Sequence, residues 1–75
     1  RLFERLQSNP PSRVAGIPVA EVKTLDGVKL IDRDESWLLF RRSGTEPIVR
    51  VYAESLTAKR VHRLLEFGVQ LVTTS

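Results

Sequence analysis

The 75-residue sequence contains no cysteine, no methionine and only one histidine. Without cysteine, neither a disulfide framework nor a thiolate metal site can form, and a single histidine lacks a second imidazole with which to share a metal. No apolar run approaches the roughly 20 residues that a membrane-spanning helix requires. The sequence therefore predicts a chain with no metal ligands of its own and no membrane span.

The missing methionine also concerns the origin of the chain, because a complete translation product normally begins with one. The sequence begins at Arg1, and we expect residues 1–75 to be a single small domain from a longer protein. Its hydrophobic content of 41% and charged content of 28% are those of a soluble globular chain. The lack of cysteine is compatible with a reducing compartment, so we expect a cytoplasmic location.

Hydrophobic periodicity predicts a mixture of strands and helices. The expected elements are a helix ending at residue 7, strands over 17–25, 36–41 and 48–54, and a helix over 56–72. The short stretch 28–31 could be a strand, a 3₁₀ turn or an extended loop, and Ser55 or Thr57 can cap the second helix. This order predicts an α+β fold, a small antiparallel sheet with two helices packed on one face.

Most basic side chains outside the loop described next are expected to be solvated surface charges. They are Lys23, Lys29, Arg33, Lys59, Arg60 and Arg63. Asp32 and Asp34 have the spacing of a fragment of a metal-binding loop, but a charged turn is the simpler interpretation. Trp37 is expected to pack against its neighbours rather than to form a platform for a sugar ring.

Two guanidinium groups, two hydroxyl groups and a glycine occur within five residues between two strand-like segments. They belong to Arg41, Arg42, Ser43, Gly44 and Thr45. Arginine offers a planar fork of donors that matches phosphate oxygens, and glycine can adopt a positive φ and lets the backbone approach a ligand. The pattern suits a phosphate or another anion, and it equally suits a hairpin loop of solvated charges. Arg50, on the following strand, is either an ion-pair partner within the sheet or another guanidinium near the anion.

The segment FRRSGTEPIVRVYAES resembles the signature of the last domain of the α-D-phosphohexomutases, the phosphoglucomutase/phosphomannomutase family. That family carries an Arg-x-Ser-Gly-Thr-Glu-Pro loop, followed by a strand that reads close to Arg-Val-Tyr-x-Glu. Residues 26–29 and 37–38 also resemble the approach to the loop, so the similarity covers about residues 16–54. The resemblance implies a fold somewhat like a unit of the TATA-box-binding protein, with two helices on one face of the sheet.

The family interconverts sugar 1-phosphates and 6-phosphates through a bisphosphate intermediate. The resemblance implies that a phosphoserine and a Mg²⁺ ion in other domains carry out the transfer, while the last domain grips the phosphate that is not reacting. It assigns phosphate binding to Arg41, Ser43, Gly44 and Thr45, and less specifically to Arg50. It assigns no catalytic residue, metal ligand or cofactor to this chain.

Three further residues of the loop have other expected roles. Arg42 departs from the family pattern, which often has proline or alanine there, and it either adds charge at the rim or faces water. Glu46 and Pro47 are expected to shape the exit of the loop. The partners implied are a phosphosugar substrate and the preceding domains of the same protein, and we expect the isolated chain to bind phosphosugars weakly without turning them over.

A stand-alone basic module that binds nucleic acid is the main alternative, because the net charge is +3 and the isoelectric point is near 10.0. One tryptophan and one tyrosine offer little for base stacking, and no basic face is evident beyond the second helix. We therefore expect no nucleic-acid partner. A purely structural capping domain is a third interpretation, and it would show no response to anions.

Overall fold

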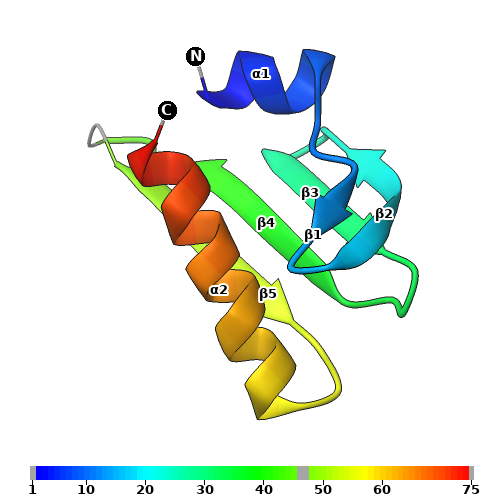
Figure 1. Cartoon of the computed structure of the whole chain (residues 1–75). Coiled ribbons are helices and arrows are strands. Elements are labelled where there is room, and N and C mark those ends of the chain that lie inside the picture. Colours follow the sequence, from blue (N-terminus) through cyan, green and yellow to red (C-terminus); the bar gives the residue numbers. More distant parts are fainter. Residues whose placement is uncertain (1, 46–47, 75) are drawn as a thin grey trace.

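The computed structural model describes residues 2–45 and 48–74, which form two helices and five strands (Figure 1). In chain order the elements are α1 (Leu2–Ser8), β1 (Arg13–Val14), β2 (Ile17–Lys23), β3 (Val28–Asp32), β4 (Trp37–Arg42), β5 (Val49–Glu54) and α2 (Ala58–Thr73). The strands form one sheet in the order β1-β2-β3-β4-β5, and neighbouring strands are antiparallel. The α+β fold predicted from the sequence is confirmed.

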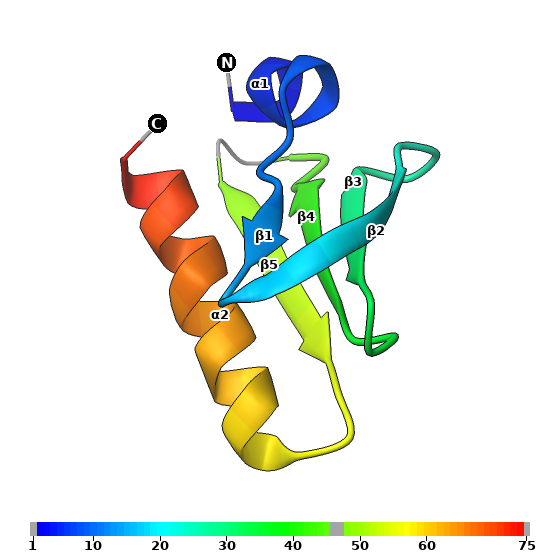
Figure 2. The same cartoon turned by 45° about the vertical axis from the view of Figure 1, so that its right-hand side comes forward.

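One face of the sheet carries the hydrophobic core. The register places Leu30 of β3 opposite Leu38 of β4, and both side chains, like that of Phe40, are at most 1% exposed. Leu6 of α1 and Leu64 of α2 belong to the same buried cluster. Both helices therefore pack on one face, as predicted, with α2 running along the curled sheet and α1 across one end of it (Figure 2).

The opposite face of the sheet is not covered by any described helix. Leu39 of β4 lies opposite Tyr52 of β5 on this face. Trp37, two residues before Leu39 along β4, projects from the same face. Trp37 is half-buried, and Lys29 Nζ lies 4.3 Å from the centroid of its ring. Trp37 thus packs against a neighbouring side chain, as the sequence predicted, and the rest of this face stays accessible.

Two glycines allow close approaches of the main chain. A Cβ at Gly68 of α2 would lie 2.7 Å from Val51 Cγ1 and 3.1 Å from Leu38 Cδ1. Gly27 has a φ of 95°, and a Cβ there would collide with the carbonyl oxygen of Phe40. Any side chain at Gly68 would push α2 away from the sheet, and any side chain at Gly27 would disturb the β2–β3 turn.

Two features of the chain were left open or missed by the sequence. The stretch 28–31 belongs to a true strand, β3, which pairs on both sides. The two-residue strand β1 was not predicted, because two residues are too few to show an alternating pattern. Its pairing with β2 forms a short hairpin, which brings the carbonyl oxygens of Val14 and Ala15 to α2.

Helix α2 is capped as the sequence predicted, since Thr57 Oγ1 accepts a hydrogen bond from Arg60 N–H at 3.1 Å.

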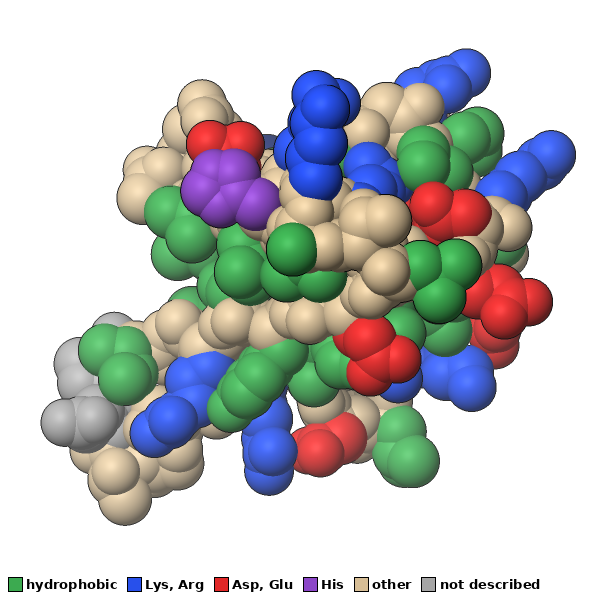
Figure 3. Space-filling view, turned by 90° about the horizontal axis from the view of Figure 1, so that it is seen from below, with side chains coloured by type: hydrophobic (Ala, Val, Ile, Leu, Met, Phe, Trp, Pro, Cys, Tyr) green, Lys and Arg blue, Asp and Glu red, His purple; other side chains and the backbone are tan. Residues whose placement is uncertain are grey.

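Within the described ranges, no helix is both long and apolar enough to cross a membrane. Seen from below, the molecule carries basic side chains scattered among acidic and hydrophobic ones (Figure 3). The surface visible in that view therefore offers no continuous basic patch.

Candidate anion-binding site

Two arginines face each other across the ends of β4 and β5, on the face that no described helix covers. The register pairs Arg41 with Arg50, and like charges directly opposite in a sheet repel each other. Arg41 Nε lies 3.7 Å from Asp26 Oδ1, but these two side chains are 52% and 74% exposed, so solvent screens their attraction. Arg50 forms no ion pair with any residue that the structure describes. This end of the sheet therefore holds positive charge that an anion would stabilise.

The loop after β4 is held closed by its own backbone. Ser43 N–H donates to the carbonyl oxygen of Ile48 at 3.1 Å, and Thr45 N–H points to Ser43 Oγ at 3.5 Å, the outer limit for a hydrogen bond. A hydroxyl oxygen that accepts this weak bond keeps its own proton to donate to a ligand. The role predicted for Glu46 and Pro47 falls outside the described residues.

Gly44 differs from Gly27 and Gly68, whose missing side chains the fold requires. Its φ is not in the positive range that the sequence allowed for it, and a Cβ there would meet no atom of the described residues within 4 Å. The described fold would therefore accept a side chain at this position. Because Gly44 has no side chain, open space remains directly over the loop backbone, where a ligand can approach the Gly44 N–H.

The five residues that the resemblance assigned to phosphate binding line a single hollow of about 350 Å³. They are Arg41, Ser43, Gly44, Thr45 and Arg50, and Arg42 and Tyr52 complete the described lining. The lining contains no acidic side chain among the described residues. Tyr52 was missed as a site residue, although its spacing of two from Arg50 on a strand places both side chains on one face.

A larger groove of about 530 Å³ lies beyond Arg41 and Arg42, toward α1. Arg42 Cζ lies 4.6 Å from the centroid of the Phe3 ring in this groove, which is within the range of a cation–π contact. The groove also contains the carboxylates of Glu4 and Asp26, which repel an anion. The smaller hollow is therefore the better candidate for an anion site, and Arg42 connects it to α1.

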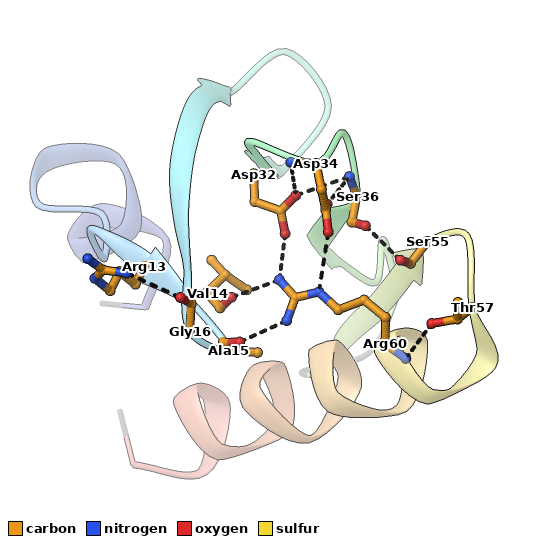
Figure 4. Close-up of polar contacts among 10 residues, drawn as sticks. All are labelled: Arg13, Val14, Ala15, Gly16, Asp32, Asp34, Ser36, Ser55, Thr57 and Arg60. Carbon is orange, nitrogen blue, oxygen red and sulfur yellow. Dashed lines mark hydrogen bonds and ion pairs between the residues drawn. The ribbon is translucent and has the colours of Figure 1, made fainter.

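The prediction that Arg60 is a solvated surface charge is wrong. Its side chain is only 13% exposed, and its guanidinium donates to Asp32 Oδ2 at 2.7 Å, to Ala15 O at 2.8 Å and to Val14 O at 3.0 Å (Figure 4). Helical periodicity placed Arg60 on the solvated face of α2, but the unpredicted β1–β2 hairpin supplies acceptors there. Arg60 is therefore a structural residue and is not available to an anion.

The two aspartates near Arg60 form the β3–β4 turn. Asp32 Oδ1 accepts hydrogen bonds from Asp34 N–H at 3.2 Å and from Ser36 N–H at 3.1 Å, and Asp34 Oδ1 accepts from Ser36 N–H at 2.9 Å. Burial raises the pKa of Asp32, whereas hydrogen bonds with Asp32 and Ser36 lower the pKa of Asp34 to about 2. Both carboxylates are thus engaged by the turn and by Arg60, which is the arrangement of a charged structural turn.

Similarity to known proteins extends over most of the chain. A family model described as "Phosphoglucomutase/phosphomannomutase, C-terminal domain" matches residues 3–70. A phosphoglucomutase/phosphomannomutase of Thermococcus kodakarensis is 40% identical over 52 residues, which are 69% of this chain and 11% of that protein. A phosphopentomutase of the same organism is 44% identical over 55 residues, or 73% of this chain and 12% of that protein. A phosphoglucosamine mutase of Methanococcus aeolicus is 47% identical over 53 residues, or 71% of this chain and 12% of that protein.

The family match includes all five described strands and the candidate anion-binding loop. The chain spans only about a tenth of the length of these relatives. The similarity therefore concerns a small part of each relative. The chain belongs to the phosphoglucomutase/phosphomannomutase family, in which it corresponds to the C-terminal domain.

Proposed function

We propose that the hollow at the β4–β5 loop binds the phosphate group of a phosphosugar within a mutase. The observation that carries this proposal is the convergence of two like-charged arginines and two hydroxyl-bearing residues on one hollow without an acidic lining. Arg41 and Arg50 supply charge, while Ser43 and Thr45 supply hydroxyl donors. Each charge-assisted hydrogen bond contributes about 1.5–3 kcal/mol, so a few of them give measurable but weak affinity.

We infer that the phosphate held here is the one that does not react. Phosphoryl transfer depends mainly on positioning and on stabilising charge. Fixing the remote phosphate orients the sugar and its second phosphate, and good orientation can supply about 7–11 kcal/mol of a barrier. Binding energy from a non-reacting group is thereby used for the reaction. The reaction would interconvert a sugar 1-phosphate and a sugar 6-phosphate through a bisphosphate whose two ends occupy this hollow in turn.

The names of the relatives support phosphate as the group that this domain recognises. The three names specify different sugars, which are glucose or mannose, pentose, and glucosamine. All the substrates so named are phosphorylated sugars. A domain shared by mutases for different sugars is best suited to the group that those sugars have in common. We infer that the choice of sugar is made mainly by other parts of the full-length enzyme.

The transfer itself requires groups that this chain does not provide in its described part. No cluster of three or more His, Asp or Glu side chains that could hold a metal ion occurs among the described residues. These residues therefore do not fit the Mg²⁺ site that the family implies. We infer that Mg²⁺ and the phosphoserine belong to other domains, and that this chain alone turns over no phosphosugar in a coupled mutase assay.

Amide NMR of the chain with increasing inorganic phosphate tests the binding site. We expect the amide signals of Ser43, Gly44 and Thr45 to shift together with one dissociation constant. Arg41→Ala should weaken the response, whereas Arg63→Ala, which alters an exposed arginine on α2 outside the hollow, should not. Signals that move elsewhere while those three stay in place would exclude the loop as the site.

Nucleic-acid binding is supported less well by the structure. The guanidinium of Arg60 is engaged by Asp32, and basic side chains are dispersed among acidic ones on the face seen in Figure 3. A basic surface that follows a nucleic-acid backbone needs a continuous stripe of such charge. A titration with single- and double-stranded DNA at low and high salt should show no tight, strongly salt-dependent binding.

A further inference from the structure

We propose that Tyr52 contacts the sugar of the bound phosphosugar, beside the phosphate that the loop holds. This inference rests on the proposed function and adds a second contact to it. Tyr52 and Arg50 are two residues apart on β5, so their side chains project from the same face of the sheet. Both line the hollow, and Tyr52 is the aromatic residue of its described lining.

The packing of the fold does not account for Tyr52. Its side chain is 40% exposed, whereas the alternate residues of β5, Val49, Val51 and Ala53, pack against the core. Its hydroxyl has no hydrogen-bond partner among the described residues. Tyrosine hydroxyls usually find a partner when they are buried, whereas Tyr52 is partly exposed and lines the hollow. The ring and the hydroxyl are therefore both available to a ligand.

The hollow has room for more than a phosphate group. At about 350 Å³ it falls within the range of roughly 300–1,000 Å³ that small-molecule sites occupy. A phosphate group, with a single phosphorus and four oxygens, fills only a small part of that volume. The remaining space can hold at least part of the sugar attached to the phosphate.

The charge of the lining favours one side of the hollow for the sugar. The larger groove beyond Arg41 and Arg42 also contains the carboxylates of Glu4 and Asp26, which offset the charge of the two arginines there, whereas the described lining of the hollow itself has no acidic side chain. Tyr52 lines the hollow beside Arg50, on the face that no described helix covers. We infer that a sugar whose phosphate lies between Arg41 and Arg50 extends over the Tyr52 ring.

The chemistry of Tyr52 suits a sugar of either hexose or pentose type. The apolar face of a phenol packs against the C–H groups of a sugar ring, and its hydroxyl can exchange a hydrogen bond with a sugar hydroxyl. Leu39 lies directly opposite Tyr52 across the strands, on the same face of the sheet. Such a contact orients the sugar without reading the hydroxyl pattern in detail, so Tyr52 is a positioning residue.

The test compares inorganic phosphate with glucose 6-phosphate as ligands of the chain, using amide NMR. The wild-type chain should bind glucose 6-phosphate more tightly than phosphate. Tyr52→Leu should weaken binding of glucose 6-phosphate by about two- to tenfold more than it weakens binding of phosphate. Tyr52→Phe should retain most of the preference, because it keeps the ring. Trp37→Leu changes the other aromatic side chain of this face, which does not line the hollow, and should alter neither constant.

The outcomes separate this inference from the proposed function. Suppose that phosphate shifts the loop amides, but Tyr52→Leu weakens the binding of both ligands equally or of neither ligand. The sugar contact is then wrong and phosphate binding stands. If phosphate does not shift Ser43, Gly44 and Thr45 in the wild-type chain, the proposed function is wrong, and the sugar contact is wrong with it. Retention of the wild-type amide pattern in Tyr52→Leu shows that a loss of affinity in that variant does not come from unfolding.

Discussion

The two ends of the sheet use arginine in opposite ways. At the end near the β3–β4 turn, Arg60 is 13% exposed and its guanidinium bonds to the Asp32 carboxylate and to two carbonyl oxygens. At the other end, Arg41 and Arg50 face each other across the strands, and Asp26 is a distant, solvent-screened partner. The first arrangement holds the β1–β2 hairpin, the β3–β4 turn and α2 together. The second gives the fold mainly repulsion between like charges, which supports the proposal that these arginines serve a ligand.

The glycines repeat the same contrast. Gly68 has no room for a Cβ because α2 lies directly on Val51 and Leu38, so the fold itself requires glycine there. Gly44 has open space around it and an ordinary φ, so the fold does not require glycine. Stability requires glycine at Gly68 and does not explain it at Gly44, which supports the proposal that the loop binds a ligand. The variants below separate the two roles.

Arg60→Met should produce the largest change in stability. The variant leaves the buried Asp32 carboxylate without its cation and two carbonyl oxygens without their donor, and breaking a buried pair in this way costs about 3–5 kcal/mol of unfolding free energy. Urea denaturation measures it. Arg63→Met, at an exposed position of the same helix, should stay within about 0.5 kcal/mol of the wild-type chain. Equal effects of the two substitutions would show that Arg60 is not a structural residue.

Arg41→Ala and Arg50→Ala should act on binding and spare stability. Loss of one charge-assisted contact of about 1.5–3 kcal/mol corresponds to roughly a 10- to 150-fold weaker dissociation constant for phosphate. Because each variant also relieves the repulsion across the strands, the unfolding free energy should stay the same or rise by about 0.2–1 kcal/mol. Parallel phosphate titrations and urea curves measure both quantities. A loss of stability as large as that of Arg60→Met would remove the distinction between the two ends.

Gly68→Ala and Gly44→Ala should separate in the same way. In Gly68→Ala the new methyl group lies 2.7 Å from Val51 Cγ1, and overpacking of this kind costs about 1–3 kcal/mol, offset by up to about 1 kcal/mol of helix propensity. Gly44→Ala should leave the urea midpoint unchanged and weaken phosphate by about tenfold, because its methyl group occupies the ligand's space. Unchanged phosphate binding in Gly44→Ala would mean that no ligand approaches the loop backbone there.

The sequence predicted the fold and the loop, because their signals are local. The segments 36–41 and 48–54 carry strand patterns, the segment 56–72 carries a helical pattern, and the structure confirms all three with small shifts at their ends. The burial of Arg60 was not predictable, since it depends on a carbonyl oxygen 45 residues earlier in the chain, in a hairpin without a periodic signal. Tyr52 was missed because its position in the hollow depends on the β4–β5 register and on the absence of a covering helix.

Acid titration gives the smallest expected effect, at the structural end of the sheet. The folded pKa of Asp34 is lowered to about 2 from an ordinary 3.8 by its hydrogen bonds with Asp32 and Ser36. A lowered pKa of a carboxyl group means a stabilising contribution that is fully present above about pH 3.8 and is lost as the pH falls toward 2. The raised pKa of Asp32 acts in the opposite sense, because protonation relieves the cost of its burial. It therefore masks part of the loss of stability that Asp34 causes as the pH falls.

Asp34→Asn isolates the contribution of Asp34. Unfolding free energies of the variant and the wild-type chain, measured in urea at pH 5 and at pH 2.5, should converge as the pH falls, because the wild-type chain loses what the variant never had. Asp34 lies at the opposite end of the sheet from the anion-binding loop. Sulfate should therefore still shift the loop amides of the variant at pH 5 with the wild-type dissociation constant. A constant difference in stability between the two chains across this pH range would show that the Asp34 carboxylate does not stabilise the turn through its charge.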